Sequence, residues 1–473
     1  MSKTVTISQA EIDRQLDIIA TLHRMIAGSG QKFCIQTYGC QQNEADSERL
    51  AGMASDMGYL ITDLPEEADV ILVNTCAVRE HAELKTLSIT GQFKHLKEKK
   101  PTLLIGLCGC MVSQEYRSDE IKKRYPYVDF VFGTGKLYCF PEILQTALGH
   151  GKRCFYRNED DGNLAEGLPV RRASKFKAWV SIMYGCNNFC TYCIVPYVRG
   201  RERSRLPADI LKEVQTLADE GYREITLLGQ NVNSYGKDLD VPYDFADLIA
   251  DICRIEGDFI VRFMTSHPKD VPHKLIDVIA VNPKVARAFH LPLQAGSDRI
   301  LREMNRHYTK QQYLDTVAEL RRKVPDISLT TDIIVGFPGE TEEDFEETLS
   351  MLRTVEFDNI YSILYSPRRG TRAAEMTDQV PESVKSARFD RMMTLQSEIS
   401  RRRNLAYEGK ISRVLVEGRS KTDASRLTGR NEKNRLVHFS GDDSLIGNWA
   451  DVLVTRAETY ALFGELPKQK DAE

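Results

Sequence analysis

The chain has 473 residues, of which 42% are hydrophobic, and it carries a formal net charge of −4. At roughly 150 residues per domain, this length predicts about three domains with enough apolar residues for buried cores. The charge excludes a globally basic nucleic-acid binder, so any RNA contact must come from local patches. The N-terminus shows no apolar signal region, and no apolar run reaches membrane-spanning length. With eleven cysteines, an odd number, we expect a protein of the reducing cytoplasm rather than a disulfide framework.

Residues 1–30 predict an amphipathic helix, because Ser8 followed by Glu11 fits a capping box and apolar residues then repeat at helical spacing. Between residues 31 and 150, short apolar runs alternate with helical patterns. This alternation predicts an open parallel α/β sheet covered by helices. The expected strands are 33–37, 70–74, 103–107 and 128–132, and the expected helices are 44–57, 80–97, 114–123 and 136–148.

Three widely spaced cysteines follow three of these strands. Cys40, Cys76 and Cys110 each lie just past the carboxyl end of a different strand. In an open α/β sheet those ends form one rim, where ligands normally bind. We therefore expect three residues that are remote in sequence to meet in space.

Residues 151–172 are charged, contain several glycines and show little periodicity, which is typical of a linker. From residue 173 to 404 the strand–helix alternation resumes with longer repeats. Six such units predict a partial (βα)6 barrel of the TIM type, whose sites lie at the strand carboxyl ends. The expected strands are 177–184, 224–228, 261–265, 287–291, 328–335 and 359–364.

A second, tight set of cysteines follows the first barrel strand. Cys186, Cys190 and Cys193 form a C-x3-C-x2-C run in GCNNFCTYCIVP. A 4Fe–4S cluster usually takes four thiolates, so a cluster on either trio would keep one iron open for a small molecule or a sulfur atom. The alternative is zinc, although structural zinc sites take four ligands and this loop offers no fourth Cys or His. The other five cysteines are interpreted as structural residues.

Residues 405–467 predict a third, small domain. Short strands are expected at 412–417, 436–439, 451–456 and 460–465, with glycine turns between them, which indicates a small β-barrel. The stretch 410–435 holds eight Lys or Arg against three acids. The chain is thus predicted to be an α/β multidomain protein.

The tight cysteine loop, with Tyr192 between its last two cysteines, resembles the cluster loop of the radical S-adenosylmethionine (SAM) enzymes. Residues 32–465 resemble the methylthiotransferase family of these enzymes through QTYGCQQNEADSERL, NTCAVREHAELK, GCMVSQE, YVRGRERSR, LLGQNVNSYG, TSHPKD, LPLQAGSD and TDIIVGFPGETEEDF. The YGCQ-N-x2-DSE and NTC-x-VRE forms are similar to the branch that modifies isopentenyl-adenosine beside the tRNA anticodon. Gln42 departs from that branch, where Met is usual, and Ala295 replaces a commoner Ser.

The resemblance implies a role for each trio. Cys186, Cys190 and Cys193 would bind the 4Fe–4S cluster that chelates SAM, and Cys40, Cys76 and Cys110 would bind an auxiliary 4Fe–4S cluster that carries the sulfur. A 5′-deoxyadenosyl radical from SAM would abstract the hydrogen at carbon 2 of adenine, which no side-chain base can remove at neutral pH. A second SAM would supply the methyl group. An electron donor such as flavodoxin or ferredoxin is expected, and the chain is expected to act as a monomer.

Candidate SAM contacts beyond the cluster follow the barrel strands, although loop capping is an equally ordinary role for any one of them. They are Gln230, Asn231, Ser266, Gln294 and Asp332.

Candidate RNA contacts come from local positive charge. Four arginines alternate at positions 199, 201, 203 and 205, so an extended chain would place them on one face for phosphate contact. The alternative is pairing with acids of the barrel or with the SAM carboxylate. The C-terminal barrel resembles a TRAM domain, an RNA-binding module, through GRNEKNRLVHFSG. Together these segments make the candidates Arg199, Arg201, Arg203, Arg205, Arg430, Lys433 and Arg435.

Two competing functions stay open at this point. A related methylthiotransferase would act on threonylcarbamoyl-adenosine in tRNA or on a ribosomal protein side chain. A non-catalytic iron–sulfur sensor that binds RNA would need no SAM.

Overall fold

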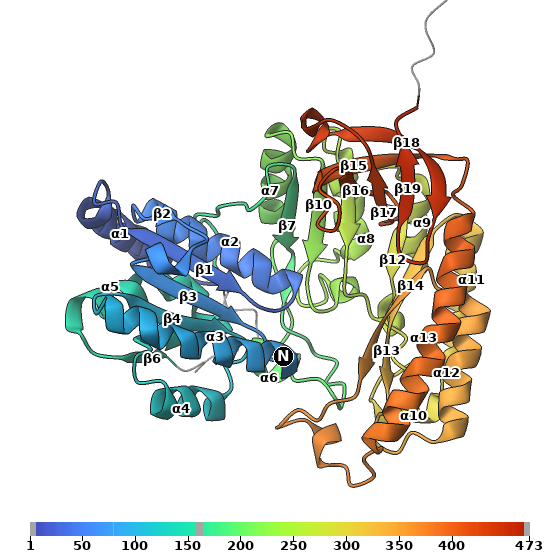
Figure 1. Cartoon of the computed structure of the whole chain (residues 1–473), viewed down its shortest axis with the longest axis horizontal. Helices are drawn as coiled ribbons and strands as arrows, with labels where there is room; N and C mark the ends of the chain where they lie inside the picture. The colour runs from blue at the N-terminus through green and yellow to red at the C-terminus, as the bar shows by residue number, and fades with distance from the viewer. Residues whose placement is uncertain (1–5, 79, 157–163, 468–473) are drawn as a thin grey trace, which may run out of the picture.

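The computed structural model describes residues 6–78, 80–156 and 164–467. The chain forms an N-terminal α/β sheet, a central half-open barrel and a small C-terminal barrel that rests on the central one (Figure 1). Within these described ranges, no helix is both long and apolar enough to cross a membrane.

The N-terminal sheet has six parallel strands in the order β2-β1-β3-β4-β5-β6. Apolar clusters fill both faces, because the central strands are hydrophobic without alternation. The predicted first helix is confirmed, and its Ser8 side chain accepts a hydrogen bond from Glu11 N. The strands are β1 Lys32–Thr37, β2 Leu60–Ile61, β3 Val70–Thr75, β4 Leu104–Gly109, β5 Phe130–Phe132 and β6 Cys154–Tyr156, and the helices are α1 Gln9–Ile26, α2 Gln41–Asp56, α3 Glu80–Lys99, α4 Glu115–Arg124 and α5 Phe140–His150, preceded by the 3₁₀ turn η2 Thr134–Cys139.

The linker prediction for residues 151–172 is wrong at both of its described ends. Strand β6 pairs with β5 and forms the sheet edge, and three residues are too few to show a period in the sequence. Farther on, Arg172 pairs with Glu48 of α2 at 3.0 Å, and Arg171 N donates to Glu48 O at 2.9 Å. These residues therefore attach the sheet to the central barrel rather than spanning a gap.

The central barrel is partial, as predicted. Its strands form two parallel sheets, β11-β10-β7 and β12-β13-β14, which a single bridge between Val261 and Val285 joins. The expected first strand splits into β7 and β8, and β8 pairs antiparallel with β9. The strands are β7 Lys177–Ser181, β8 Met183–Tyr184, β9 Arg203–Ser204, β10 Glu224–Leu228, β11 Ile260–Phe263, β12 Ala288–His290, β13 Ser328–Val335 and β14 Asn359–Leu364, and the helices are α6 Val195–Arg199, α7 Pro207–Asp219, α8 Phe245–Arg254, α9 His273–Val281, α10 Asp298–Glu303, α11 Lys310–Lys323, α12 Glu342–Val355 and α13 Glu382–Leu405.

The C-terminal domain is a closed five-stranded barrel in the order β15-β16-β17-β19-β18. Strand β16 was not expected, because it holds the run LTGRN, in which the buried positions after Leu427 are a glycine and an asparagine and so hide the alternation. The strands are β15 Ile411–Arg419, β16 Leu427–Asn431, β17 Leu436–Phe439, β18 Trp449–Ala457 and β19 Leu462–Glu465.

Candidate active site

The three separated cysteines meet at one rim of the N-terminal sheet, as predicted. Cys40 is the first residue before α2, while Cys76 and Cys110 directly follow the adjacent strands β3 and β4. A side chain at Gly39 would come within 2.8 Å of the Cys76 Cβ, so the turns that carry Cys40 and Cys76 touch. Burial raises the pKa of the Cys110 thiol to about 12, Arg199 opposes that rise, and Cys76 and Cys40 add to it. Metal binding at this rim must therefore displace a firmly held proton.

The tight trio lies in a loop that the central barrel holds in place. Thr191 donates from its backbone N to Met304 O at 3.1 Å and from its hydroxyl to Glu303 O at 2.9 Å. Asn305 donates to the carbonyls of Asn188 and Phe189. Gly185 enters the loop at φ 75°, and a Cβ there would lie 1.9 Å from Arg201 O. The loop is thus rigid before any ligand binds.

The spacing of the cysteine sulfurs in each trio bears on whether a single zinc ion could bind there. A tetrahedral zinc with Zn–S bonds of about 2.3 Å needs its sulfurs about 3.8 Å apart. In the described part of the chain, the only three metal-ligating groups whose ligand atoms all lie within 4.8 Å of one another are Glu11, Cys139 and Glu142, so neither cysteine trio is that tight. Neither trio is therefore arranged in advance for a single zinc ion.

Arg306 is a residue of the site that the sequence analysis missed. Its buried guanidinium donates to Cys190 Sγ at 3.5 Å and to Pro292 O at 3.0 Å. Tyr308 lies against it, with the guanidinium 5.3 Å from the ring centroid. No sequence pattern marks Arg306, because it reaches the cysteine loop from a turn more than a hundred residues away.

Three of the predicted SAM contacts present polar atoms that the protein does not satisfy. Gln230 Oε1, Asn231 Oδ1 and Ser266 Oγ are buried and have no hydrogen-bond partner among the described residues, and all follow the neighbouring strands β10 and β11. Asn233 and His267, which the sequence analysis did not select, have buried unpartnered polar atoms in the same two loops. Buried polar atoms without partners are costly, so this rim fits a polar ligand such as SAM.

The other two predicted SAM contacts belong to the second sheet, where Gln294 follows β12 and Asp332 lies within β13. Gln294 is buried with a left-handed φ of 69°, and its backbone N donates to Asp332 O at 2.8 Å. The Asp332 carboxylate lies 3.5 Å from His290 Nε2. A non-glycine residue held in this backbone region is strained, which is typical of ligand-binding turns.

The prediction of an exposed arginine face is wrong for three of its four members. Strand β9 has only two residues, so the alternation does not extend from 199 to 205. Arg203 is buried and donates to the carbonyls of Arg201 and Arg199. Arg205 is buried and forms ion pairs with Glu166 and Glu213, which agrees with the alternative that these arginines pair with acids. Arg199 is also buried.

Arg201 alone stays exposed, and it lies beside two aromatic rings. Its guanidinium is 4.3 Å from the ring centroid of Phe189, a residue of the tight cysteine loop. Tyr197, which is 58% exposed, meets Phe189 edge-on at 5.8 Å. We call Phe189, Tyr197 and Arg201 the loop platform.

Two of the three basic residues predicted to bind RNA from the C-terminal barrel instead dock that barrel. Arg435 is buried and pairs with the carboxylate of Asp358, and Lys433 pairs with Asp326 at 2.8 Å. Arg262 of β11 donates to the carbonyl of Asn431 at 2.7 Å, in the same docked stretch. Arg430 is 37% exposed and lies 3.7 Å from Glu417.

A different face of the C-terminal barrel combines charge with an aromatic ring. Phe463 stacks on His438 with centroids 5.3 Å apart. The guanidinium groups of Arg456 and Arg426 lie 4.2 and 5.6 Å from the Phe463 ring. We call these four residues the barrel platform. Its composition is typical of surfaces that stack single-stranded bases.

Three families match successive parts of the chain. Residues 32–133 match the Uncharacterized protein family UPF0004, residues 180–352 match the Radical SAM superfamily, and residues 405–466 match the TRAM domain.

Full-length relatives and solved structures are also similar to this chain. The tRNA-2-methylthio-N(6)-dimethylallyladenosine synthase of Thermoanaerobacter pseudethanolicus is 51% identical over 466 residues, which cover 98% of this chain and 99% of the relative. The synthase of the same name from Alkaliphilus oremlandii is 52% identical over 462 residues, 98% of each chain. The radical S-adenosylmethionine methyltransferase TsrM from Kitasatospora setae has a TM-score of 0.54 at 13% identity and covers 73% of this chain and 75% of its own, a likeness of fold alone.

Proposed function

The chain belongs to the family of tRNA-2-methylthio-N(6)-dimethylallyladenosine synthases, and we propose that it inserts sulfur and transfers a methyl group at carbon 2 of isopentenyl-adenosine next to the anticodon of tRNA. Isopentenyl and dimethylallyl denote the same substituent. As a radical SAM enzyme the protein uses iron–sulfur chemistry and SAM. The observation that supports the detailed proposal is a contact between the two cysteine-bearing segments, since Arg199, six residues past Cys193, donates to Cys110 Sγ.

Each trio has a separate role in this proposal. Cys186, Cys190 and Cys193 hold the SAM-binding cluster, while Cys40, Cys76 and Cys110 hold the auxiliary one. When bound, these groups supply the electron that cleaves SAM and the sulfur that is transferred. The protein contributes the unpartnered Gln230, Asn231 and Ser266 atoms as donors and acceptors for SAM, and Gln294 and Asp332 shape the opposite side of the same rim.

An apolar contact between the two domains keeps water from this region. Ala77 and Cys110 of the N-terminal sheet pack on Ile194 and Val198 of the central barrel, and all four are buried. Excluding water protects a reactive radical from side reactions. This cluster would shield one side of the region between the two cysteine sites from water.

For the RNA we propose two contact surfaces. The loop platform lies within and beside the tight cysteine loop, where a base splayed from the anticodon loop could stack on Tyr197 and meet the Arg201 charge. The barrel platform, with Arg430 on the neighbouring strand, would hold a second part of the tRNA. Recognition of unpaired bases by aromatic and guanidinium groups is the common mode for single-stranded RNA.

The remaining elements of the proposal concern partners and location. An electron donor such as flavodoxin or ferredoxin would reduce the SAM-binding cluster, and the chain would act as a monomer in the cytoplasm. These elements rest on the family resemblance.

The test compares nucleosides after reaction. Reconstituted enzyme with SAM and a reductant is incubated with tRNA that carries isopentenyl-adenosine or, in parallel, threonylcarbamoyl-adenosine, and the digested nucleosides are analysed by mass spectrometry. We expect 2-methylthio-isopentenyl-adenosine and no product from the second tRNA. Product from the threonylcarbamoyl substrate alone would refute the substrate assignment, and failure to form 5′-deoxyadenosine at all would favour a non-catalytic sensor.

A further inference from the structure

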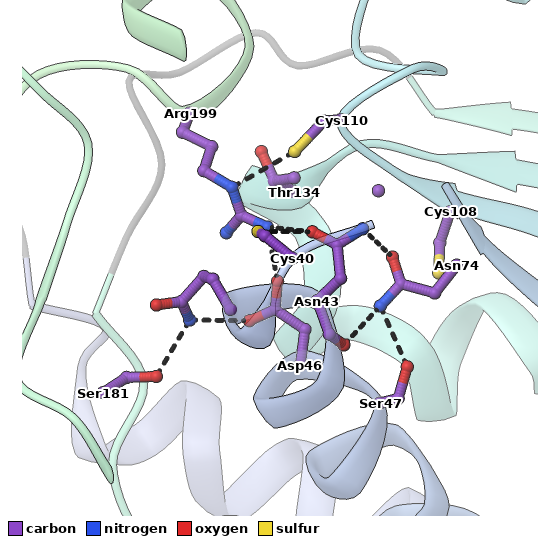
Figure 2. A network of polar contacts seen from close by, with 12 residues as sticks. Cys40, Asn43, Asp46, Ser47, Asn74, Cys108, Cys110, Thr134, Ser181 and Arg199 are labelled. Carbon is purple, nitrogen blue, oxygen red and sulfur yellow. Dashed lines mark hydrogen bonds and ion pairs between the residues drawn. The ribbon is translucent and has the colours of Figure 1, made fainter. Parts of the chain in front are cut away.

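Arg199 extends from the central barrel into the rim of the auxiliary site. It ends the short helix α6, yet its guanidinium lies between residues of the N-terminal sheet (Figure 2). Nε donates to Cys110 Sγ at 3.1 Å, and Nη2 donates to Asn43 Oδ1 at 2.8 Å and to Asp46 Oδ2 at 2.9 Å. One side chain therefore joins the two domains at a proposed cluster ligand.

The burial of this arginine indicates a strong constraint. The side chains of Arg199 and Asp46 are 4% and 2% exposed, so both charges are removed from water. A buried charge is tolerated only with good geometry and hydrogen bonding, and removing one partner leaves the other charge uncompensated. The guanidinium has a fixed planar fork, so its partners must hold one relative orientation.

The partners of Arg199 are themselves held by the strand ends of the sheet. Asn43 Nδ2 donates to Thr75 O at 2.9 Å, next to Cys76. Asn74 Nδ2 donates to Asn43 O at 2.9 Å (Figure 2). Cys40 Sγ lies 3.7 Å from Asn43 Oδ1. Asn43 thus contacts Cys40 and the residue before Cys76, and its acceptor Thr75 O also accepts a hydrogen bond from Cys110 N at 2.9 Å. Arg199 in turn contacts Asn43.

Two more contacts cross the same interface. Gln42 Nε2 donates to Ser181 Oγ at 2.8 Å and to Asp46 Oδ1 at 3.2 Å, and Thr134 Oγ1 donates to Val198 O at 2.6 Å. A methionine at position 42 could not make the first two bonds. The substitution that distinguishes this chain from the usual pattern therefore strengthens the connection between Asp46 and the central barrel.

We propose that Arg199 is a positioning residue that locks the auxiliary site to the central barrel and, by donating to the Cys110 sulfur, raises the reduction potential of the cluster bound there. A hydrogen bond to a cluster thiolate stabilises the more negative, reduced state, which makes reduction easier. The same bond fixes the place of the auxiliary site relative to SAM. This inference rests on the proposed auxiliary cluster.

The first experiment isolates the auxiliary site. In a background with Cys186, Cys190 and Cys193 all replaced by Ala, the reconstituted protein is titrated anaerobically and the cluster is followed by electron paramagnetic resonance. Arg199→Met is expected to shift the midpoint potential to a more negative value, and Arg199→Lys to shift it less. Arg254→Met, an exposed arginine on α8, is the matched control and is expected to leave the potential unchanged.

The outcomes separate the inference from the function. If the protein with all three cysteines replaced but with Arg199 intact binds no iron, the proposed auxiliary cluster itself is wrong. A fully loaded Arg199→Met protein with the parental potential would overturn only the role of Arg199. If Arg199→Met loses its iron, the potential of Arg199→Lys tests the inference instead. A lysine ammonium group cannot reproduce the three bonds, so an unshifted potential in that variant would equally overturn the inference.

The second experiment uses the complete enzyme and measures positioning. We expect Arg199→Lys to raise the ratio of 5′-deoxyadenosine to methylthiolated product several-fold, because SAM cleavage needs only the tight trio whereas sulfur transfer needs both sites aligned. Gln42→Met should raise the same ratio less. A ratio equal to that of the parent in both variants would contradict a positioning role.

Discussion

Arg435 and Arg456 of the C-terminal barrel have opposite expected roles, although both are arginines of an RNA-binding module. Arg435 Nη1 donates to Asp358 O at 3.2 Å, and Nη2 pairs with the same residue's carboxylate. Without Arg435, the Asp358 carboxylate would still accept hydrogen bonds from Arg403 Nε at 2.5 Å and from Leu329 N at 2.6 Å. Arg435→Met thus deletes one charged and one backbone contact without stranding Asp358.

The expected loss follows from those two contacts. Hydrogen bonds to charged groups contribute roughly 1.5–3 kcal/mol, and removing one partner of a buried pair costs at most about 3–5 kcal/mol. We expect Arg435→Met to weaken docking of the barrel by about 3 kcal/mol, or roughly a hundredfold in the opening equilibrium. Native-state hydrogen exchange of strands β15 to β19 measures this opening directly.

Arg456→Met is the crossed control. Arg456 is exposed beside Phe463 and pairs with the exposed Glu458, so its loss should change exchange by no more than about 0.5 kcal/mol. It should instead weaken tRNA binding and reduce the slope of log affinity against log salt by about 0.7–1.

The two variants can refute the reasoning independently. If Arg435→Met shows the hydrogen exchange of the parent but a smaller slope of log tRNA affinity against log salt, Arg435 is a phosphate contact after all. Parental tRNA binding by Arg456→Met would exclude Arg456 as an RNA contact. Deleting the whole barrel is a poorer experiment, because it uncovers Asp358 and Arg262 on the central domain.

Three further predictions concern the cluster sites and one buried acid. Cys76→Ala should retain about half of the reconstituted iron and keep forming 5′-deoxyadenosine, but it should lose sulfur insertion. Cys186→Ala should lose SAM cleavage. An unchanged iron content in Cys76→Ala would contradict its role as a ligand. Gly185→Ala should abolish loading of the tight trio, since its Cβ meets a carbonyl at 1.9 Å, while Gly91→Ala in α3 meets no atom within 4 Å and should leave loading intact. Burial raises the pKa of Glu340 from 4.5 to about 7, despite a backbone N–H and an arginine that oppose the shift. Between these two pH values the folded state binds a proton that the unfolded state has released. The free energy of unfolding, measured by urea titration, should therefore fall by at most about 3 kcal/mol as pH rises from about 4.5 to 7. Glu340→Gln should remove this pH dependence.

Much of the architecture could be predicted from the sequence because its signals are local. The runs 224–228, 328–335 and 359–364 form strands with the expected bounds, since each is apolar and flanked by turn residues. Strands β2, β6 and β16 escaped prediction because they are too short or too polar to show a period. The parallel order of β1, β3 and β4 then sufficed to bring Cys40, Cys76 and Cys110 together.

Positive charge was a poor guide to RNA contact for a physical reason. A guanidinium can serve a phosphate in solvent or a buried carboxylate with the same donors, and the sequence does not report which acid lies opposite. Arg199 and Arg435 found such acids in Asp46 and Asp358, which come from distant parts of the chain, and Arg205 found one in Glu213, eight residues along.

By itself the sequence determined the two cysteine trios, the strand–helix alternation that holds them and the family whose chemistry they serve, because each of these is encoded by residue type at short spacing. Only the tertiary structure decided which arginines stay in water, where Arg306 and Arg199 reach the cysteines, and how the C-terminal barrel docks. These features depend on pairs of residues that are far apart in the chain, and a charge moves from solvent to interior only when folding brings its partner beside it.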